Sequence, residues 1–237
     1  MDIKILYDNT KSARGFKTGW GFSVLINDTI LFDTGEDPGS LRANMEKMNV
    51  DPAGIQAVVL SHEHWDHIDG IWGLFAKRPG LTVYGCPHFS QECKDNIGMH
   101  GGRYDAYPTL HEIAPHIFVS GEMKTEYKGK PLYEQSLIIR TDTVCTLITG
   151  CAHPGILTII DKVRNDLTID TLDLVLGGFH LKDKKDDEIE GIIAEFRARG
   201  VRKIAPAHCT GERAITLIKK AFGPAYIPVG AGATITI

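Results

Sequence analysis

The chain has 237 residues, with 26 Lys and Arg against 30 Asp and Glu, and a net charge of −4. Its 43% hydrophobic content and 24% charged content exclude a disordered chain, and the length fits one domain spanning residues 1–237. The slightly acidic balance argues against a protein that binds nucleic acid through a basic surface. We therefore expect a small-molecule partner, and the composition leaves the oligomeric state open.

No stretch of the sequence has the character of a membrane span. Charged residues interrupt the apolar run at residues 1–8, and no later stretch approaches eighteen apolar residues. The five cysteines are odd in number and form no CxxC pair, which is typical of reduced thiols. These features predict a cytoplasmic protein.

The first third of the chain is rich in predicted strands. Alternating apolar residues predict strands over 3–7, 21–26 and 29–33, with a turn at Asn27-Asp28. A helix with Ser40 as its N-cap should follow, then a buried strand over 55–60 and a helix from about 67 to 76. An antiparallel hairpin sheet is expected here.

The last hundred residues repeat one strand and one helix three times. The strands are predicted over 144–149, 172–176 and 203–205. Ile189, Ile192, Ile193 and Phe196 mark the helix after the second strand, Gly200 ends it, and Thr210 is a candidate N-cap of the last helix. This alternation implies an α/β fold in which helices cover sheets.

Between these parts, residues 85–113 carry many Gly, His and polar residues. Long loops in compact domains are usually functional or mobile, so we expect an insertion that lines the active site. The alternative is a surface connector.

Metal-ligand residue types crowd into the segment Ser61-His62-Glu63-His64-Trp65-Asp66-His67, directly after a predicted strand. Imidazole and carboxylate groups suit Zn²⁺ and similar first-row ions. Alternate side chains leaving a strand end can converge on one point. The segment therefore predicts metal binding rather than a solvated loop.

Three further histidines, His153, His180 and His208, follow the three repeated strands at spacings of 27 and 28 residues. A strand and a returning helix of this length repeat the chain direction, so these side chains should emerge at one sheet edge. That edge would then hold seven candidate ligands. The remaining histidines that we considered, His88, His100, His111 and His116, are expected outside the chemistry.

The cluster has the form HxHxDH, and with it the chain resembles the metallo-β-lactamase superfamily. Phe32-Asp33-Thr34-Gly35 is similar to the family's Asp-Thr-Gly after a hairpin, and Pro206-Ala207-His208 is similar to its final histidine segment. The resemblance implies a four-layer αββα sandwich, an α/β fold, and a metal-dependent hydrolase.

The sequence departs from the family pattern in its middle. Where the family has Thr-Gly-Asp, the chain has Thr149-Gly150-Cys151-Ala152-His153, so the bridging carboxylate is missing, and Tyr133-Glu134-Gln135-Ser136-Leu137 stands where a His is usual. With Gly177-Gly178-Phe179-His180-Leu181, this segment resembles the subgroup named for a dihydropterin-methyl-ribofuranosyl-aminobenzene phosphate synthase.

We assign the ligands to two divalent ions, zinc first, with manganese or iron as alternatives. His62, His64 and His153 are expected at one ion, and Asp66, His67 and His208 at the other. Two such ions can hold a hydroxide between them as the nucleophile. Asp33 is expected to orient a ligand imidazole. Cys151 is either a soft ligand or a small buried filler, and the filler is the expected role.

The surplus imidazole of His180 is expected to act as a general acid or to hold a phosphate, and the alternative is a hydrogen bond to a ligand. Asp66 and His180 are thus the candidate catalytic residues. Lys182 and Arg103 are possible phosphate contacts, although surface charge is the expected role of both. The predicted function is a dinuclear hydrolase of a small phosphoester. Alternatives are a lactone or thioester hydrolase, a pterin-condensing synthase, and a non-catalytic metal-binding module.

Overall fold

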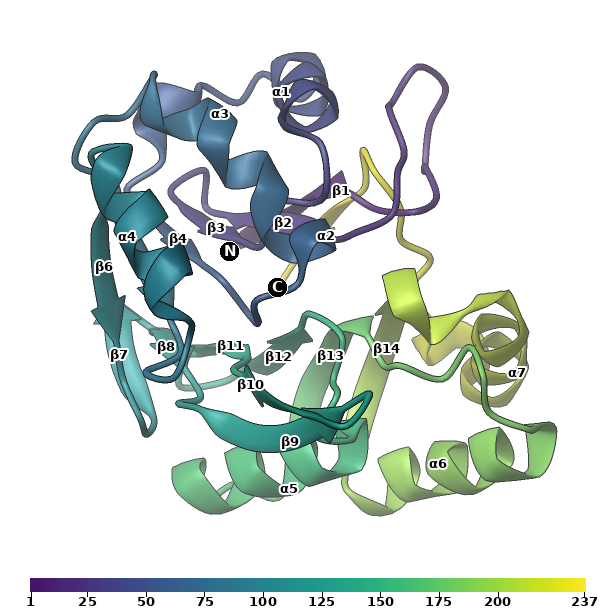
Figure 1. Ribbon diagram of the computed structural model, residues 1–237. Helices are drawn as coiled ribbons and strands as arrows, with labels where there is room; N and C mark the ends of the chain where they lie inside the picture. Colours follow the sequence, from purple (N-terminus) through teal and green to yellow (C-terminus); the bar gives the residue numbers. More distant parts are fainter.

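The computed structural model describes residues 1–237 and contains two large sheets, each covered by helices on its outer face (Figure 1). The first sheet has the order β15-β1-β2-β3-β4-β5-β6. Its strands are β1 (Asp2–Tyr7), β2 (Ser23–Ile26), β3 (Ile30–Phe32), β4 (Ala57–Val59), β5 (Thr82–Gly85), β6 (Arg103–Ala106) and β15 (Thr234–Thr236). Strands β3 to β6 pair in parallel, and the other pairs are antiparallel.

The second sheet has the order β14-β13-β12-β11-β8-β7. Its strands are β7 (His111–Ala114), β8 (Ile117–Val119), β11 (Leu137–Arg140), β12 (Cys145–Thr149), β13 (Leu172–Gly178) and β14 (Val201–Ala207). Strands β12, β13 and β14 are parallel neighbours, as the repeated pattern predicts. A separate hairpin of β9 (Met123–Tyr127) and β10 (Lys130–Glu134) lies beside this sheet (Figure 1).

Three buried apolar clusters separate four layers, which confirms the αββα sandwich. One cluster packs the first sheet against α1 (Pro38–Lys47), α3 (Trp72–Phe75) and α4 (Gln91–Met99), and α2 (Trp65–Ile68) precedes α3. Another packs the second sheet against α5 (Ile156–Leu167), α6 (Asp186–Ala198) and α7 (Glu212–Phe222). The third lies between the sheets and includes side chains from both. No helix combines the length and the apolar character needed to cross a membrane.

Two helix starts differ from the sequence expectation. The side chain that caps α1 belongs to Asp37, which accepts the backbone N–H of Ser40 at 2.6 Å, so Ser40 lies inside the helix. Pro38 suits the first helical position because its missing N–H has no partner to lose. The residue directly before α7 is Gly211, not Thr210. The Thr210 hydroxyl does not cap the helix but accepts the N–H of Phe179 at 3.0 Å.

The helix predicted over 67–76 is broken in the structure. It begins at Trp65, and a 3₁₀ turn over Asp69–Ile71 separates α2 from α3. The N–H of Gly70 donates to the Gly35 carbonyl at 3.0 Å instead of to a helical carbonyl. Gly70 packs so closely on the loop after β3 that a Cβ at this position would stand 2.0 Å from the Thr34 carbonyl oxygen. This contact with the loop interrupts the helix.

Candidate metal centre

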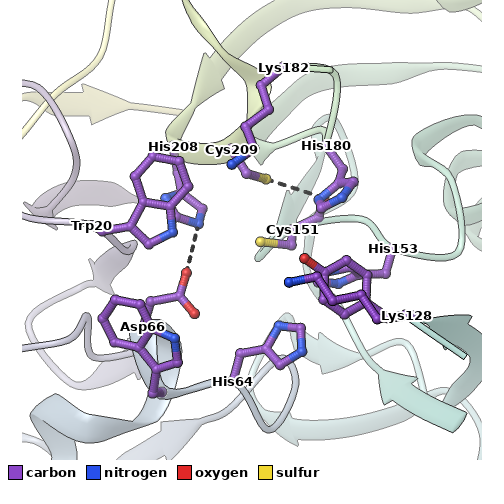
Figure 2. A pocket seen from close by; sticks show the side chains of 12 residues that line it. Trp20, His64, Asp66, Lys128, Cys151, His153, His180, Lys182, His208 and Cys209 are labelled. Carbon is purple, nitrogen blue, oxygen red and sulfur yellow. Dashed lines mark hydrogen bonds and ion pairs between the residues drawn. The ribbon is translucent and has the colours of Figure 1, made fainter. Parts of the chain in front are cut away.

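The predicted ligands gather at one edge of the two sheets, where strands end (Figure 2). The loop and short helix after β4 carry one set, and the loops after β12, β13 and β14 carry His153, His180 and His208. The cavity between them has a volume of about 360 Å³. The repeated strands thus bring three histidines far apart in sequence to one place, as their spacing predicts.

Five groups of side chains lie close enough to share an ion, and two of them consist of the predicted ligands alone. In the first, the ligand atoms of His62, His64 and His153 all lie within 4.8 Å of one another. In the second, the Asp66 carboxylate lies 3.7 Å from His67 Nε2 and 3.4 Å from His208 Nε2. These are the two triads expected from the sequence.

A single buried carboxylate fixes two of these imidazoles. Asp33 Oδ2 accepts the Nδ1–H of His67 at 2.6 Å and the hydroxyl of Ser61 at 2.7 Å. The Ser61 oxygen lies 2.8 Å from Nδ1 of His62 and can accept its proton, because its own hydrogen goes to Asp33. Both rings then carry a proton on Nδ1 and turn Nε2 toward another predicted ligand, His62 toward His64 at 3.0 Å and His67 toward Asp66 at 3.7 Å. Metal-binding imidazoles are usually oriented in this way. Asp33 therefore has the orienting contact expected from the sequence.

The buried carboxylate of Glu134 orients the His153 ring, a role that the sequence did not predict. Its Oε2 accepts Nδ1–H of His153 at 2.8 Å and the backbone N–H of the same residue at 2.9 Å. Its other oxygen accepts the backbone N–H groups of Cys151 and Ala152. Burial opposes ionisation, but the hydrogen bonds and charge of His153 and the backbone N–H groups together outweigh it and lower the pKa of Glu134. In the sequence Glu134 stands between Tyr133 and Gln135, shortly before the apolar strand β11, and nothing else marks it.

His208 is held by two residues that directly follow β1. Its Nδ1 lies 2.9 Å from the Asn9 amide oxygen, and its backbone N–H donates to Asp8 at 2.9 Å. Its Nε2 is buried without a hydrogen-bond partner. A buried nitrogen with a free lone pair is costly unless a ligand satisfies it. The donor set and this orphaned atom fit a divalent metal ion.

Burial and charge set opposite protonation states on adjacent histidines. Burial, aided by His153, lowers the pKa of His64 to about 4, and burial together with His67 holds the pKa of His62 well below its usual range. Burial also opposes protonation of His67, but the Asp33 carboxylate outweighs it and raises the pKa of His67 to about 9. Neutral imidazoles at His62 and His64 are in the form that binds metals.

Cys151 lies in the middle of the side chains labelled in Figure 2. Its sulfur is 3.3 Å from His67 Nε2, and it belongs to three of the possible metal-binding groups. Beside it, the Cys209 thiol hydrogen-bonds the His180 ring. The filler role expected for Cys151 thus has a competitor, because a sulfur at this distance from the ligand nitrogens is placed to bind the same ion.

Positive φ angles occur at residues that carry or hold the site: Asp33 at 54°, Ala152 at 61°, His180 at 52° and His208 at 48°. This region is unfavourable for residues with a Cβ and recurs at functional sites. Of these residues, His180 and His208 follow strand ends and line the cavity, whereas Asp33 holds His67 from behind.

Residues 85–113 do not line the cavity, which corrects the expectation of an insertion that walls the site. They form α4, β6 and the start of β7, and parallel pairing of β6 with β5 holds them in the first sheet. The wall comes instead from Tyr127 and Lys128 at the turn between β9 and β10. Arg103 lies away from the cavity and pairs with Asp105 at 2.7 Å.

The other histidines also lie elsewhere. None of His88, His100, His111 and His116 lines the cavity. His88 stacks on Tyr133 and donates Nδ1–H to the Glu122 carboxylate, while His111 stacks on Tyr107. Aromatic packing accounts for the positions of His88, His100 and His111.

Comparison with known proteins gives a consistent result. The model of the metallo-β-lactamase superfamily matches residues 21–160. The chain is 29% identical to a 7,8-dihydropterin-6-methyl-4-(β-D-ribofuranosyl)-aminobenzene-5′-phosphate synthase of Methanocaldococcus jannaschii, covering 87% of this chain and 84% of that protein. It is 26% identical to a ribonuclease Z of Aeropyrum pernix, covering 90% and 68%. A crystal structure of a metal-dependent hydrolase of the β-lactamase superfamily superposes with a TM-score of 0.83 at 29% identity, covering 100% and 99% of the chains.

Proposed function

The chain belongs to the metallo-β-lactamase superfamily, and we propose that it is a cytoplasmic hydrolase that uses two divalent metal ions, zinc first, to cleave a small phosphoester. The observation that carries the proposal is the pair of adjacent triads, in which four of the five imidazoles, those of His62, His67, His153 and His208, have a hydrogen-bond partner at Nδ1 outside the triads. The five cysteines are free and buried, which suits a reducing compartment.

We assign His62, His64 and His153 to one ion, and Asp66, His67 and His208 to the other. Divalent ions at such a site lower the pKa of a bound water and polarise a phosphoryl oxygen. Asp33, Glu134 and Asn9 hold the ligand rings in position. Asp66 adds negative charge: burial opposes it, but the His208 ring, whose Nε2 lies 3.4 Å from the carboxylate, and the charge of His67 lower the pKa of Asp66 to about 2.

His180 is the candidate general acid. It lies on the cavity wall beside His153, with ring centroids 4.6 Å apart, and its Nδ1 is buried without a hydrogen-bond partner. The hydrogen bond to Cys209 raises the pKa of His180, although burial opposes the shift. A raised pKa favours the protonated ring, which can donate its proton to a leaving oxygen.

The similarity to a synthase supports a second candidate, a condensation that joins a pterin to an aminobenzene ribosyl phosphate. Both candidates require the same metal-binding residues. They differ in the product, because only the condensation forms a new bond between two organic molecules.

The proposed function is tested with protein reconstituted with zinc. Elemental analysis should give about two ions per chain, because the six ligands exceed the four that one tetrahedral ion uses. A phosphodiester with a nitrophenolate leaving group should be hydrolysed in preference to a panel of lactones and thioesters. Turnover of lactones or thioesters alone would overturn the phosphoester assignment.

The condensation is tested by incubating the same protein with hydroxymethyl-dihydropterin diphosphate and the ribosyl-aminobenzene phosphate. A joined product would favour the synthase over the hydrolase. Full metal loading without turnover in any of these assays would favour a non-catalytic metal-binding module.

A further inference from the structure

Aromatic side chains gather at the mouth of the metal centre. Only three large hydrophobic side chains of the molecule are exposed: Trp20 at 37%, Trp65 at 53% and Met99 at 74%. Both tryptophans line the cavity of the metal centre, and Tyr127 lines it from the β9–β10 turn. Exposed tryptophan is unfavourable in water, and such residues concentrate at sites that bind ligands.

Trp65 has a free ring. Trp20 already packs its edge against His208, at a centroid distance of 5.1 Å, but Trp65 contacts neither another aromatic ring nor a cationic side chain. Trp65 also stands between the proposed ligands His64 and Asp66 in the sequence. A planar group stacked on it would therefore lie next to the proposed reaction centre.

Two lysines at the mouth are placed by aromatic rings. The Lys182 ammonium lies 4.5 Å from the centroid of Trp20, and the Lys128 ammonium lies 5.1 Å from the centroid of Tyr127. Cation–π contacts of this kind favour one position of an otherwise flexible chain. Neither ammonium is within ion-pair distance of a carboxylate, so both charges remain available to an anion.

We propose that this mouth selects substrates in which a planar aromatic group is joined to an anionic phosphoryl group. Trp65 stacks on the aromatic group, and Lys128 and Lys182 attract the phosphoryl group toward the metal-binding residues. The phosphoryl part of the inference rests on the proposed function. The aromatic part rests on the free tryptophan ring.

The cavity has room for an aromatic group larger than one ring. A second cavity of about 650 Å³ adjoins the first and shares Trp20, Lys182 and His208 with it. The first turn of α7 and Tyr226 line its far side. A substrate that spans both cavities would pass directly beside Trp20 and Lys182.

The test measures binding rather than turnover. Phenylphosphonate and methylphosphonate carry the same anionic group and differ only in the aromatic ring. On zinc-reconstituted protein, calorimetric titration should give a dissociation constant about 10-fold lower for phenylphosphonate, the size expected for one stacked ring. Trp65→Ala should bring this ratio close to one, whereas Trp65→Phe should retain most of it.

The lysines should act on both ligands alike. Lys128→Ala and Lys182→Ala should each weaken phenylphosphonate and methylphosphonate by a similar factor, on the order of 3- to 10-fold at low salt. Lys130→Ala is the matched control, because Lys130 is exposed on the same hairpin but does not line the cavity. It should leave both constants unchanged.

Equal affinities for the two phosphonates in the native protein, or a ratio that survives Trp65→Ala, would overturn the aromatic selection. Loss of affinity in Lys130→Ala equal to that in Lys128→Ala would overturn the assigned lysines. Because binding is the readout, a protein that hydrolyses phosphoesters but binds both phosphonates equally refutes this inference alone. A protein that shows the aromatic preference without phosphoester turnover refutes the proposed function alone.

Discussion

Glu134 is a buried carboxylate with four donors around its two oxygens, and His153 supplies two of them. Glu134→Gln replaces one oxygen by an NH₂ group that faces donors. The His153 ring should then lose its fixed orientation, and metal affinity should fall about 10- to 100-fold in a competition assay with a chromogenic chelator. Glu126→Gln, at an exposed position on β9, is the control and should retain native affinity. Unchanged affinity in Glu134→Gln would show that the ring needs no such support.

His153 and His180 should respond differently to removal. His153→Ala should lose metal together with activity, because it takes away a proposed ligand. His180→Ala should keep both ions while kcat falls about 10²- to 10⁴-fold for a poor leaving group, and less for nitrophenolate, which hardly needs a proton. Metal loss in His180→Ala with retention in His153→Ala would reverse the two roles. Equal rate losses for all leaving groups would make His180 a phosphate contact.

The opposite pKa shifts of His64 and His67 give opposite pH effects in the metal-free protein. The pKa of His64 is lowered to about 4, so its contribution to stability is present above about pH 6.5 and declines as the pH falls toward 4. The pKa of His67 is raised to about 9, so its contribution is complete below about pH 6.5 and declines as the pH rises toward 9.

Urea unfolding of chelator-treated protein at pH 5.5 and 7.5 measures both effects. His64→Gln should cost less stability at pH 5.5 than at pH 7.5, and His67→Gln should cost more at pH 5.5 than at pH 7.5. Shifts of the same sign in both variants would contradict the two protonation states.

Among single residues, the sequence predicts those whose side-chain type and spacing already indicate metal binding. The HxHxDH segment and the three later histidines carry ligand atoms at spacings that name a metal site, and the structure brings them together. Glu134 and Asn9 were not predicted, because each acts only through a contact with a residue distant in the sequence. A Glu or Asn in isolation is more often a surface residue.

The same distinction holds for helices and strands. The three parallel strands β12, β13 and β14 were predicted, because apolar runs followed by amphipathic helices have few other arrangements. The break between α2 and α3 was not predicted, since Gly70 leaves the helix for a contact with the loop after β3. The segment 85–113 was misinterpreted because the composition of its turns hid a helix and an edge strand.

Gly150, directly after β12, packs against Ser61 in the loop after β4 and leaves no room for a side chain. A Cβ there would stand 2.1 Å from Ser61 Oγ, the atom that connects His62 to Asp33. Gly150→Ala should displace Ser61 and lower metal affinity at least several-fold by the same competition assay. Gly191→Ala in α6 meets no atom within 4 Å and should stabilise the protein by about 0.5–1 kcal/mol without changing metal affinity. Native affinity in Gly150→Ala would indicate that Ser61 has no part in holding His62.

On the scale of the whole molecule, the proposed metal ions join the two sheets. Four proposed ligands follow β4 of the first sheet, namely His62, His64, Asp66 and His67, whereas His153 and His208 follow β12 and β14 of the second. The apolar cluster between the sheets joins them from the inside. Metal binding should therefore stabilise the contact between both halves rather than either half alone.

Chelation should consequently lower the melting temperature of the whole chain. Ions present at about 100 times their dissociation constant contribute about 2.7 kcal/mol, which corresponds to roughly 5–10 °C for a chain of this size. All three tryptophans, Trp20, Trp65 and Trp72, lie in the first half, so their fluorescence reports on that half, while far-UV circular dichroism reports on both. With one domain over 1–237, the two signals should change in a single coincident transition, with and without metal. If fluorescence melted apart from circular dichroism in the metal-loaded protein, the two halves would be independent units, and the expectation of one domain would be wrong.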